Sequence, residues 1–354
     1  MKSIENADTP NVQYEISDPL VIAITPVVSV QMITYNHGPY LAEAIEGVIA
    51  QKTDFPIELI IGEDCSTDNT RDIALDYQRR YPQLIRVIYS DRNVGMIANG
   101  RRVRAACRGE FIAFCEGDDY WVDQEKLCIQ VDILSRYKNI DLTFHSCYLR
   151  YENCQKKFLS CVHSSRDKLI ELSKVISGDG GFMPTASLLV RRNLLLSFQD
   201  WFDDKIPVGD YFLQVFGSQR GGAYYLNKPM SVYRKNVGGS WVQRTKKIDA
   251  LIEFEKKFYY SLRQLEYLIP EQKNAFNRII VSHFSGRFIA AKNMNCDRLM
   301  DVALNILKDR MHMLSHLQKI KVFLLQKRVF VFIFPTTDLV LHVINKHIIR
   351  LGLK

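Results

Sequence analysis

The sequence predicts an α/β protein in which helices flank a mostly parallel, open sheet, followed by a helical C-terminal region. From about residue 26, short β-rich runs alternate with segments of helical periodicity, as in parallel strands joined by crossover helices. From Lys246 onward the periodicity is almost entirely helical until residue 329. A chain of 354 residues with 47% hydrophobic and 24% charged residues is also too apolar to be disordered or of low complexity.

The first half of the chain carries the clearest strand and helix patterns. Strands are predicted at 27–34, 57–61, 84–89, 110–115 and 142–147, and the helices between them end near Gln51, Tyr81, Cys107 and Tyr137. The fourth strand has no polar residue from Phe111 to Phe114, which is typical of a strand buried on both faces. Farther along, strands are predicted at 186–190, 223–226 and 231–234, and a short helix opens at Asp210.

These patterns divide the chain into an N-terminal extension (1–25), an α/β domain (26–245) and a basic helical region (246–354). The basic region holds 19 Lys/Arg against 9 Asp/Glu. This excess indicates an anionic neighbour such as a membrane surface or phosphates, or simply solvated helix faces. The eight cysteines have no paired spacing and the N-terminus has no signal-peptide pattern, so we expect free thiols in a reducing cytoplasm.

Acidic side chains follow two of the predicted strands. Glu116-Gly117-Asp118-Asp119 begins where the fourth strand ends, and Glu63-Asp64 follows the second. Because parallel strands place their carboxyl ends at one edge of a sheet, we expect both segments to border one crevice. A divalent metal held there by one or two carboxylates would keep sites open for phosphate oxygens, which favours a nucleoside diphosphate ligand. A solvated acidic turn is the alternative for either segment alone.

Four segments, taken together in their order and spacing, closely resemble glycosyltransferase family 2. They are Val28-Ser29-Val30 with Thr34-Tyr35-Asn36, Glu63-Asp64-Cys65-Ser66-Thr67-Asp68-Asn69-Thr70, Asn93-Val94-Gly95, and the run from Gly109 to Trp121. The resemblance implies a GT-A fold, with a Rossmann-like nucleotide-sugar half joined to an acceptor half. It also implies an inverting sugar transfer from a nucleoside diphosphate sugar, a UDP-sugar being favoured, to an acceptor hydroxyl with Mg²⁺ or Mn²⁺.

The resemblance also implies roles for individual residues. Thr34, Tyr35 and Asn36 would border the base and ribose, Asp64 would hydrogen-bond the base, and Asp118 would bind the metal. The family usually has Asp where this chain has Glu116, so Glu116 takes a weaker role at the ribose or metal, and Asp119 a supporting one near the sugar. Asn99 would contact phosphate or sugar, or would instead make a structural hydrogen bond in its helix.

An inverting transfer needs a base on the face of the anomeric carbon opposite the leaving diphosphate. The family places an Asp at the start of a helix in the acceptor half, and Asp210 fits that position, with Asp203 and Asp204 as rivals. An ordinary helix N-cap is the structural alternative for Asp210. In a late loop, Arg234 would neutralise diphosphate charge and Trp241 would stack on a sugar, or both would be packing residues.

The C-terminal tail combines aromatic, aliphatic and cationic residues. Within 319–354, an apolar run follows Lys327 and Arg328, and three further cations close the chain. Such a segment can lie in a bilayer interface or pack on protein. We expect peripheral contact with the inner face of the plasma membrane, where a glycan or lipid-linked glycan acceptor would be met, and we expect no nucleic-acid partner. No membrane-spanning helix is predicted, and the interrupted apolar run is too short for one.

The sequence therefore favours a metal-dependent, inverting and non-processive glycosyltransferase that assembles bacterial surface polysaccharide or a lipid-linked glycan. One alternative is a sugar-nucleotide-binding protein without turnover. Another is a nucleotidyltransferase, which shares the open sheet and metal carboxylates but attacks phosphorus. Residues 35–39 lack the Gly-rich, basic phosphate loop that a nucleotidyltransferase would usually carry.

Overall fold

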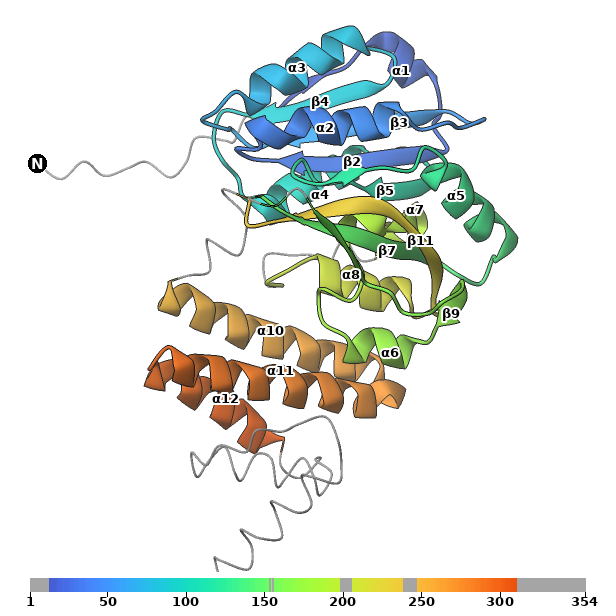
Figure 1. The fold of residues 1–354 in the computed structure, drawn as a ribbon. Coiled ribbons are helices and arrows are strands. Elements are labelled where there is room, and N and C mark those ends of the chain that lie inside the picture. Colours follow the sequence, from blue (N-terminus) through green and yellow to red (C-terminus); the bar gives the residue numbers. More distant parts are fainter. Residues whose placement is uncertain (1–12, 153, 155, 198–205, 238–246, 311–354) are drawn as a thin grey trace, which may run out of the picture. The chain divides into compact units, whose positions relative to one another are not determined.

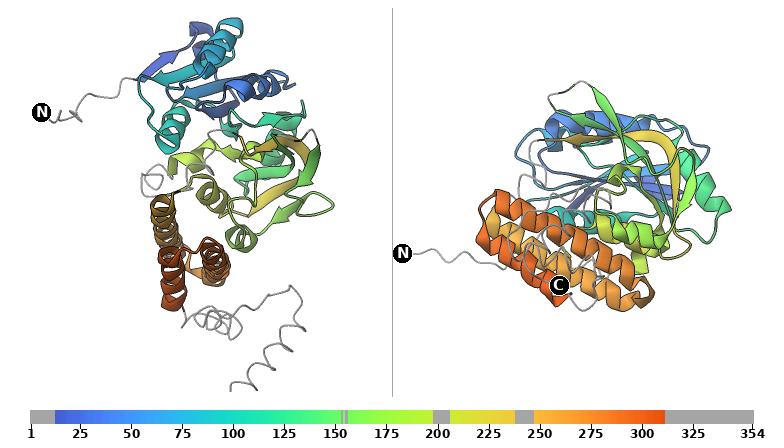
Figure 2. Two further views of the ribbon diagram at one scale, coloured as in Figure 1. Left: turned by 60° about the vertical axis from the view of Figure 1, so that its left-hand side comes forward. Right: turned by 60° about the horizontal axis from the view of Figure 1, so that its bottom comes forward.

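A computed structural model of the chain describes residues 13–152, 154, 156–197, 206–237 and 247–310. By its internal contacts the chain divides into two compact units, 1–279 and 280–354. The predicted domain boundary near residue 245 lies outside the described residues. The α/β prediction is confirmed, because the first unit is built on one mixed sheet that runs through both of its halves (Figures 1 and 2).

The N-terminal half of the sheet is a parallel four-stranded core in the order β4-β3-β2-β5. These strands are β2 (Val28–Thr34), β3 (Ile57–Glu63), β4 (Ile85–Ser90) and β5 (Phe111–Phe114), and the connecting helices are α2 (Gly38–Ile49), α3 (Thr70–Arg80) and α4 (Met96–Ala106). Helices α2 and α3 share a hydrophobic core with Leu59 and Ile61, whereas Gly62 faces Val103 of α4. Since neighbouring side chains of a strand point to opposite faces, the helices cover both faces. The predicted double burial of β5 is confirmed.

The second half continues the same sheet with strands of mixed direction. Its elements are β6 (Tyr120–Trp121), α5 (Lys126–Arg136), β7 (Leu142–Tyr151), β8 (Lys157–Ser160), β9 (Lys168–Ile170), α6 (Leu172–Ser177), η1 (Thr185–Ser187), β10 (Leu189–Arg191), α7 (Arg192–Ser197), α8 (Asp210–Gly217) and β11 (Ala223–Lys235). Strand β10 lies antiparallel between β5 and β7, and therefore joins the two halves. Strand β11 runs parallel to β7 and antiparallel to β6 and β9.

The described residues after 246 are helical, as predicted. They form α10 (Ile248–Leu268), a short 3-10 turn η2 (Pro270–Gln272), α11 (Lys273–Asn293) and α12 (Asp297–Asp309). Within the described ranges, none of the helices combines the length and the apolar character that crossing a bilayer would require. The predicted membrane-interface tail, 319–354, lies outside these ranges.

The structure adds the short elements β6, β8, β9, α6 and α7, which were not predicted, and departs from the predicted elements in three further places. The N-terminal extension contributes β1 (Gln13–Ile16) and α1 (Pro19–Ala23), and β1 pairs antiparallel with β4. Strand β1 is short and mostly exposed, so its sequence lacks the alternation that reveals a strand. The strand predicted at 186–190 begins later because 185–187 form a 3-10 turn. The two strands predicted near 225 and 232 are one strand, β11, with an irregularity at 226–231 that disguises its continuity.

A buried ion network on β3 ties the N-terminal segment to the sheet. Glu58, with a 1% exposed side chain, accepts hydrogen bonds from Arg86, Arg108 and Ser29 at 2.6–3.0 Å, and Arg86 also bonds Glu15 of β1. Burial alone would raise the pKa of Glu58, but the bonds from Arg108 and Ser29 and the charge of Arg86 lower it below its ordinary value. The ionised carboxylate therefore stabilises the folded chain.

Replacing Glu58 by Gln should lower the free energy of unfolding at pH 7 by about 3 kcal/mol, because Arg108 loses its charge partner and Arg86 keeps only Glu15. Since folding lowers the pKa of Glu58, this stabilisation is full above the unfolded-state pKa and disappears as pH falls through the folded-state pKa. Denaturant unfolding across acidic pH checks both effects. As a control, Glu110→Gln breaks an exposed 3.7 Å pair with Arg191 and should change stability by less than about 0.5 kcal/mol. Equal stability losses in both variants would contradict the prediction.

Candidate active site

The two acidic segments are brought to one edge of the sheet. The backbone N–H of Asp64 donates to the carbonyl of Thr34 at 3.1 Å, and that of Gly117 donates to the carbonyl of Ile33 at 3.0 Å. Strands β3 and β5 flank β2 on opposite sides and run parallel to it. Both loops are therefore anchored to the last residues of β2, in the arrangement that the parallel-strand argument predicts.

The loop after β2 is held by the loop after β3. Asn36 has a left-handed backbone (φ 56°), and its side-chain oxygen accepts the N–H of Thr67 at 2.8 Å. The N–H of Asn36 donates to Ser66 Oγ at 3.0 Å. The hydroxyl of Thr34 is buried and has no hydrogen-bond partner within the described part of the chain. A Cβ at Gly117 would lie only 2.7 Å from that hydroxyl. The backbone of the acidic loop therefore passes so close to Thr34 that only glycine fits at position 117.

Asp64 is buried, and its carboxylate binds backbone N–H groups of the loop before α4. Its two oxygens accept the N–H groups of Val94 and Gly95 at 2.8 and 2.9 Å, and Arg102 lies 3.8 Å away. This pairing links the predicted Glu63-Asp64 and Asn93-Val94-Gly95 motifs to each other. The contact of Asp64 with a base stays a prediction.

Asn99 makes structural hydrogen bonds at both ends of its side chain. The amide nitrogen donates to the carbonyl of Gly62 at 2.8 Å, and the oxygen accepts from Arg102 at 2.9 Å. Its side chain is buried between α4 and β3. This geometry favours the structural alternative over a contact with phosphate or sugar.

The acidic motif concentrates negative charge at the end of β5. Burial, together with the charges of Asp118 and Asp210, raises the pKa of Glu116 well above its ordinary value. Burial and the charges of Asp118 and Glu116 likewise raise the pKa of Asp119, whose carboxylate accepts the N–H of Arg234 at 2.9 Å. Asp118 remains partly exposed, with an oxygen 3.8 Å from His37 Nε2. The carboxylates repel one another, and a divalent cation would relieve this repulsion.

Among residues in the described ranges, no three acidic, His or Cys side chains surround a point that could hold a metal ion. The prediction was of an ion held by one or two carboxylates, which leaves its other ligands to phosphate oxygens and water. Asp118 and Glu116 are both partly solvent-accessible, and neither side chain makes a hydrogen bond within the described residues. The residues present therefore fit a divalent cation at Asp118.

Asp210 approaches the acidic motif from the other half of the sheet. It is the first residue of α8, and its charge contributes to the raised pKa of Glu116. Burial also raises the pKa of Asp210 itself, although its oxygen accepts the N–H of Tyr211 at 2.7 Å. The N-cap of α8 is Gly209 and not Asp210, so helix capping by itself does not explain an Asp at position 210. The predicted base thus lies within electrostatic reach of the predicted metal motif.

Arg234 hydrogen-bonds the backbone of the acidic loop. Its guanidinium donates to the carbonyl of Asp118 at 2.7 Å and pairs with the Glu43 carboxylate, and it lies 4.3 Å from the centre of the Tyr120 ring. These contacts agree with the packing alternative. Neutralisation of diphosphate by Arg234 stays a prediction, and Trp241 lies outside the described residues.

Sequence reasoning missed two residues of this site. Glu43 lies on α2 and pairs with Arg234 across 191 positions of the chain, which no local pattern reveals. Tyr233, next to Arg234 on β11, has its pKa raised by burial and then by the charges of Asp119, Glu116, Asp118 and Asp210. Its phenol is therefore within electrostatic reach of the same carboxylates. The alternation of β11 predicts that Tyr233 and Arg234 point to opposite faces of the sheet. It does not predict which face lies against the acidic motif.

Replacing Arg234 by Lys should loosen the acidic loop, because an ammonium cannot reproduce the paired contacts of the guanidinium. We expect a loss of about 1–3 kcal/mol in unfolding free energy and weaker binding of a nucleotide sugar. Thermal unfolding and calorimetric titration measure these effects. As a matched control, Arg150→Lys alters a more exposed arginine near the same Tyr120 and Glu43 and should change neither property measurably. Indistinguishable Arg234→Lys and wild-type proteins would overturn this role.

Solved structures share this fold. TarS of S. aureus, solved in complex with UDP-GlcNAc, matches with a TM-score of 0.62 and 18% identity over 85% of this chain and 87% of that chain. The mannosyltransferase PcManGT from Pyrobaculum calidifontis, solved with GDP-Man and Mn²⁺, matches with a TM-score of 0.50 and 14% identity over 86% and 80%. The chain therefore has the GT-A glycosyltransferase fold.

The family assignment follows from the sequence. Residues 29–195 match the family model described as glycosyl transferase family 2, so this part of the chain is a domain of that family. An uncharacterised protein of Mycobacterium tuberculosis is 37% identical over 217 residues, which is 60% of this chain and 60% of that protein. The chain thus spans less than two thirds of the length of the curated relatives it matches first.

Proposed function

We propose that this protein transfers a sugar from a nucleoside diphosphate sugar to an acceptor hydroxyl, with inversion and with a divalent cation. The observation that carries the proposal is the approach of Asp210, from the second half of the sheet, to the Glu116-Asp118 motif of the first. A site that only binds nucleotide has no need of a half-buried carboxylate beside the motif. An inverting transfer needs one.

The donor would lie across the carboxyl ends of β2, β3 and β5. Thr34, Tyr35, Asn36 and Asp64 would border the nucleoside, and Glu116 and Asp119 would lie near the ribose and sugar. Asp118 would hold Mg²⁺ or Mn²⁺, which when bound neutralises charge on the leaving diphosphate. TarS binds UDP-GlcNAc and PcManGT binds GDP-Man with Mn²⁺. These complexes support a nucleotide-sugar donor, with a UDP-sugar as our first choice.

Asp210 would accept the proton of the acceptor hydroxyl as its oxygen forms the new bond to the anomeric carbon. The bond from that carbon to the diphosphate breaks on the opposite face, so the configuration inverts. Burial, which raises the pKa of Asp210, makes its carboxylate a stronger base than an exposed one. The proton therefore moves to a group whose basicity suits the task.

We propose a glycan or lipid-linked glycan of a bacterial surface polysaccharide as the acceptor, met at the inner face of the membrane through residues 319–354. Full-length protein should float with liposomes that contain anionic lipid, because the tail joins apolar residues to cations. A chain ending near residue 318 should stay in the dense fraction. If neither protein floats, the membrane proposal fails, and the proposed reaction is unaffected.

The test of the proposed reaction has two stages. Wild-type protein is screened by thermal shift against a panel of nucleotide sugars with and without Mn²⁺, and the best binder is then followed for nucleoside diphosphate release with candidate acceptors. Release of the diphosphate together with a product of inverted configuration supports the proposal. Binding without release on any acceptor would favour a protein without turnover. Release of pyrophosphate from a nucleoside triphosphate would favour a nucleotidyltransferase.

A further inference from the structure

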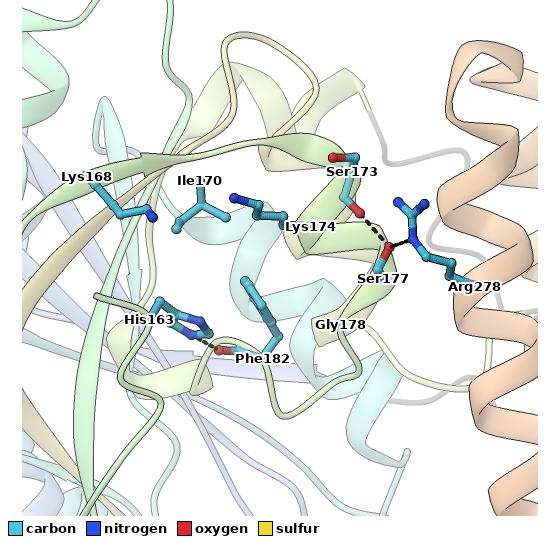
Figure 3. A pocket seen from close by; sticks show the side chains of 9 residues that line it. All are labelled: His163, Lys168, Ile170, Ser173, Lys174, Ser177, Gly178, Phe182 and Arg278. Carbon is cyan, nitrogen blue, oxygen red and sulfur yellow. Dashed lines mark hydrogen bonds between the residues drawn. The ribbon is translucent and has the colours of Figure 1, made fainter. Parts of the chain in front are cut away.

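A second candidate ligand site lies in the acceptor half, apart from the acidic motif. It is a pocket of about 360 Å³ between β9, α6, the loop after α6 and the side chain of Arg278 on α11, all within the first unit. Figure 3 shows the residues around it, and the lining consists of His163, Lys168, Ile170, Ser173, Lys174, Ser177, Gly178, Phe182 and Arg278. None of these residues takes part in the site described above.

The lining carries positive charge without a carboxylate. Lys168, Lys174 and Arg278 all contribute to it, and within the described ranges none of the three forms an ion pair. The acidic residues nearest in sequence to the lining, Asp167, Glu171 and Asp179, are not part of it. Three uncompensated cations around one concave surface favour an anionic ligand.

The geometry of Arg278 favours an oxyanion. Its Nε donates to Ser177 Oγ at 3.1 Å, and Ser177 Oγ in turn donates to the carbonyl of Ser173 at 2.7 Å (Figure 3). These bonds hold one edge of the guanidinium while its two terminal nitrogens make no hydrogen bond within the described residues. An arginine fork beside lysines and serine hydroxyls matches the several oxygens of a phosphate group.

One wall of the pocket is aromatic and uncharged. The His163 ring contacts the rings of Phe144, Phe182 and Tyr225, and its Nε2 bonds the carbonyl of Phe182 at 2.9 Å. Burial and the nearby charge of Lys168 lower the pKa of His163, so the imidazole is neutral at pH 7. The cations therefore share the pocket with an aromatic, uncharged wall.

One short loop connects this pocket to the candidate base. Gly178 and Phe182 line the pocket, whereas a Cβ at Gly180 would lie 3.7 Å from an Asp210 oxygen. Gln214 of α8 donates to the carbonyl of Gly180 at 3.2 Å and holds this loop against the helix. A ligand in the pocket would therefore lie next to the loop that contacts Asp210.

We propose that this pocket binds a phosphate group of the acceptor, either a phosphodiester of a phosphate-bearing glycan or polyol chain, or the diphosphate of a lipid-linked glycan. This inference rests on the proposed sugar transfer, since it names the acceptor class of that reaction. It adds an anionic acceptor subsite, centred on Lys168, Lys174 and Arg278, to a donor site that already takes one diphosphate.

The experiment measures binding rather than turnover. Full-length wild-type protein, the Lys168→Gln/Lys174→Gln double variant, Arg278→Gln and the control Lys138→Gln, an exposed lysine elsewhere in this half, are titrated with two probes. One probe is a short glycerol phosphate oligomer, and the other is a short-chain polyprenyl diphosphate in detergent. The lysines are not buried, so the double variant should fold normally, and thermal unfolding checks this.

We expect the double variant to bind at least one probe about tenfold or more weakly than wild type, from the loss of two charge-assisted contacts. Arg278→Gln should show a smaller loss, and Lys138→Gln none. The probe that responds identifies the source of the phosphate. If both probes bind wild type and double variant alike, or neither probe binds wild type, the inference is wrong. Affinity for a nucleotide sugar with Mn²⁺, measured on the same proteins, should stay unchanged. If wild-type protein does not bind a nucleotide sugar with Mn²⁺, the proposed donor site is wrong, whatever the two phosphate probes show.

Discussion

Replacing Asp210 by Asn is expected to reduce sugar transfer by about 10²–10⁴-fold while donor affinity stays within about twofold of wild type. The Asn side chain has nearly the same size, and its oxygen can still accept the hydrogen bond from the Tyr211 N–H. It cannot take a proton from the acceptor hydroxyl. Steady-state rates of diphosphate release and calorimetric titration of the donor separate these two effects.

The control for this variant is Asp179→Asn. Asp179 is an exposed carboxylate close enough to raise the pKa of Asp210, so its loss changes the local charge without removing the base. We expect its rate to remain within a few-fold of wild type. Normal turnover in Asp210→Asn would mean that the base lies elsewhere, with Asp203 and Asp204, which lie outside the described residues, as the next candidates.

The pH dependence of transfer gives an independent check on Asp210. The base must be ionised to accept a proton, and burial raises the pKa of Asp210 above its ordinary value. The rate should therefore fall on the acid side at a higher pH than an exposed Asp would cause. The residual activity of Asp210→Asn should lack this acid limb. An unchanged limb in the variant would assign it to a different group.

The second large effect is expected at Asp118. Replacement by Asn should remove the Mn²⁺-dependent part of donor affinity, a loss of at least about tenfold, because a neutral amide is a poorer ligand for a hard divalent cation. Titrating the donor in Mn²⁺ and in EDTA measures the metal-dependent part directly. In EDTA, the variant and wild-type proteins should bind the donor about equally.

Asp132→Asn is the control for Asp118. This carboxylate pairs with Arg136 on the exposed side of α5 and lies outside the site. Its removal should leave the Mn²⁺ response intact. Full Mn²⁺ dependence in Asp118→Asn would show that other residues of the motif hold the ion, and the role of Asp118 would have to be abandoned.

The fold could be predicted to a large extent because its signals are local. The apolar run Phe111–Phe114 and the periodicity of α2 and α3 can be recognised in short windows of sequence. The convergence of Asp64 with Glu116-Asp118 followed from the rule that parallel strands end at one edge. The N-terminal β1 and the continuity of β11 could not be predicted, since one is a short exposed edge strand and the other is interrupted by an irregularity.

By itself, the sequence determined the kind of protein this is: an open α/β sheet with carboxylates at its strand ends, and a family 2 glycosyltransferase domain over residues 29–195. Only the tertiary structure decided which groups the individual side chains contact. It bound the Asp64 carboxylate to the N–H groups of Val94 and Gly95, set Arg234 behind the acidic loop, and brought Asp210 near Glu116. The physical reason is distance along the chain: strand and helix patterns repeat every few residues, whereas these contacts join residues roughly 30 to 115 positions apart and depend on how whole elements pack.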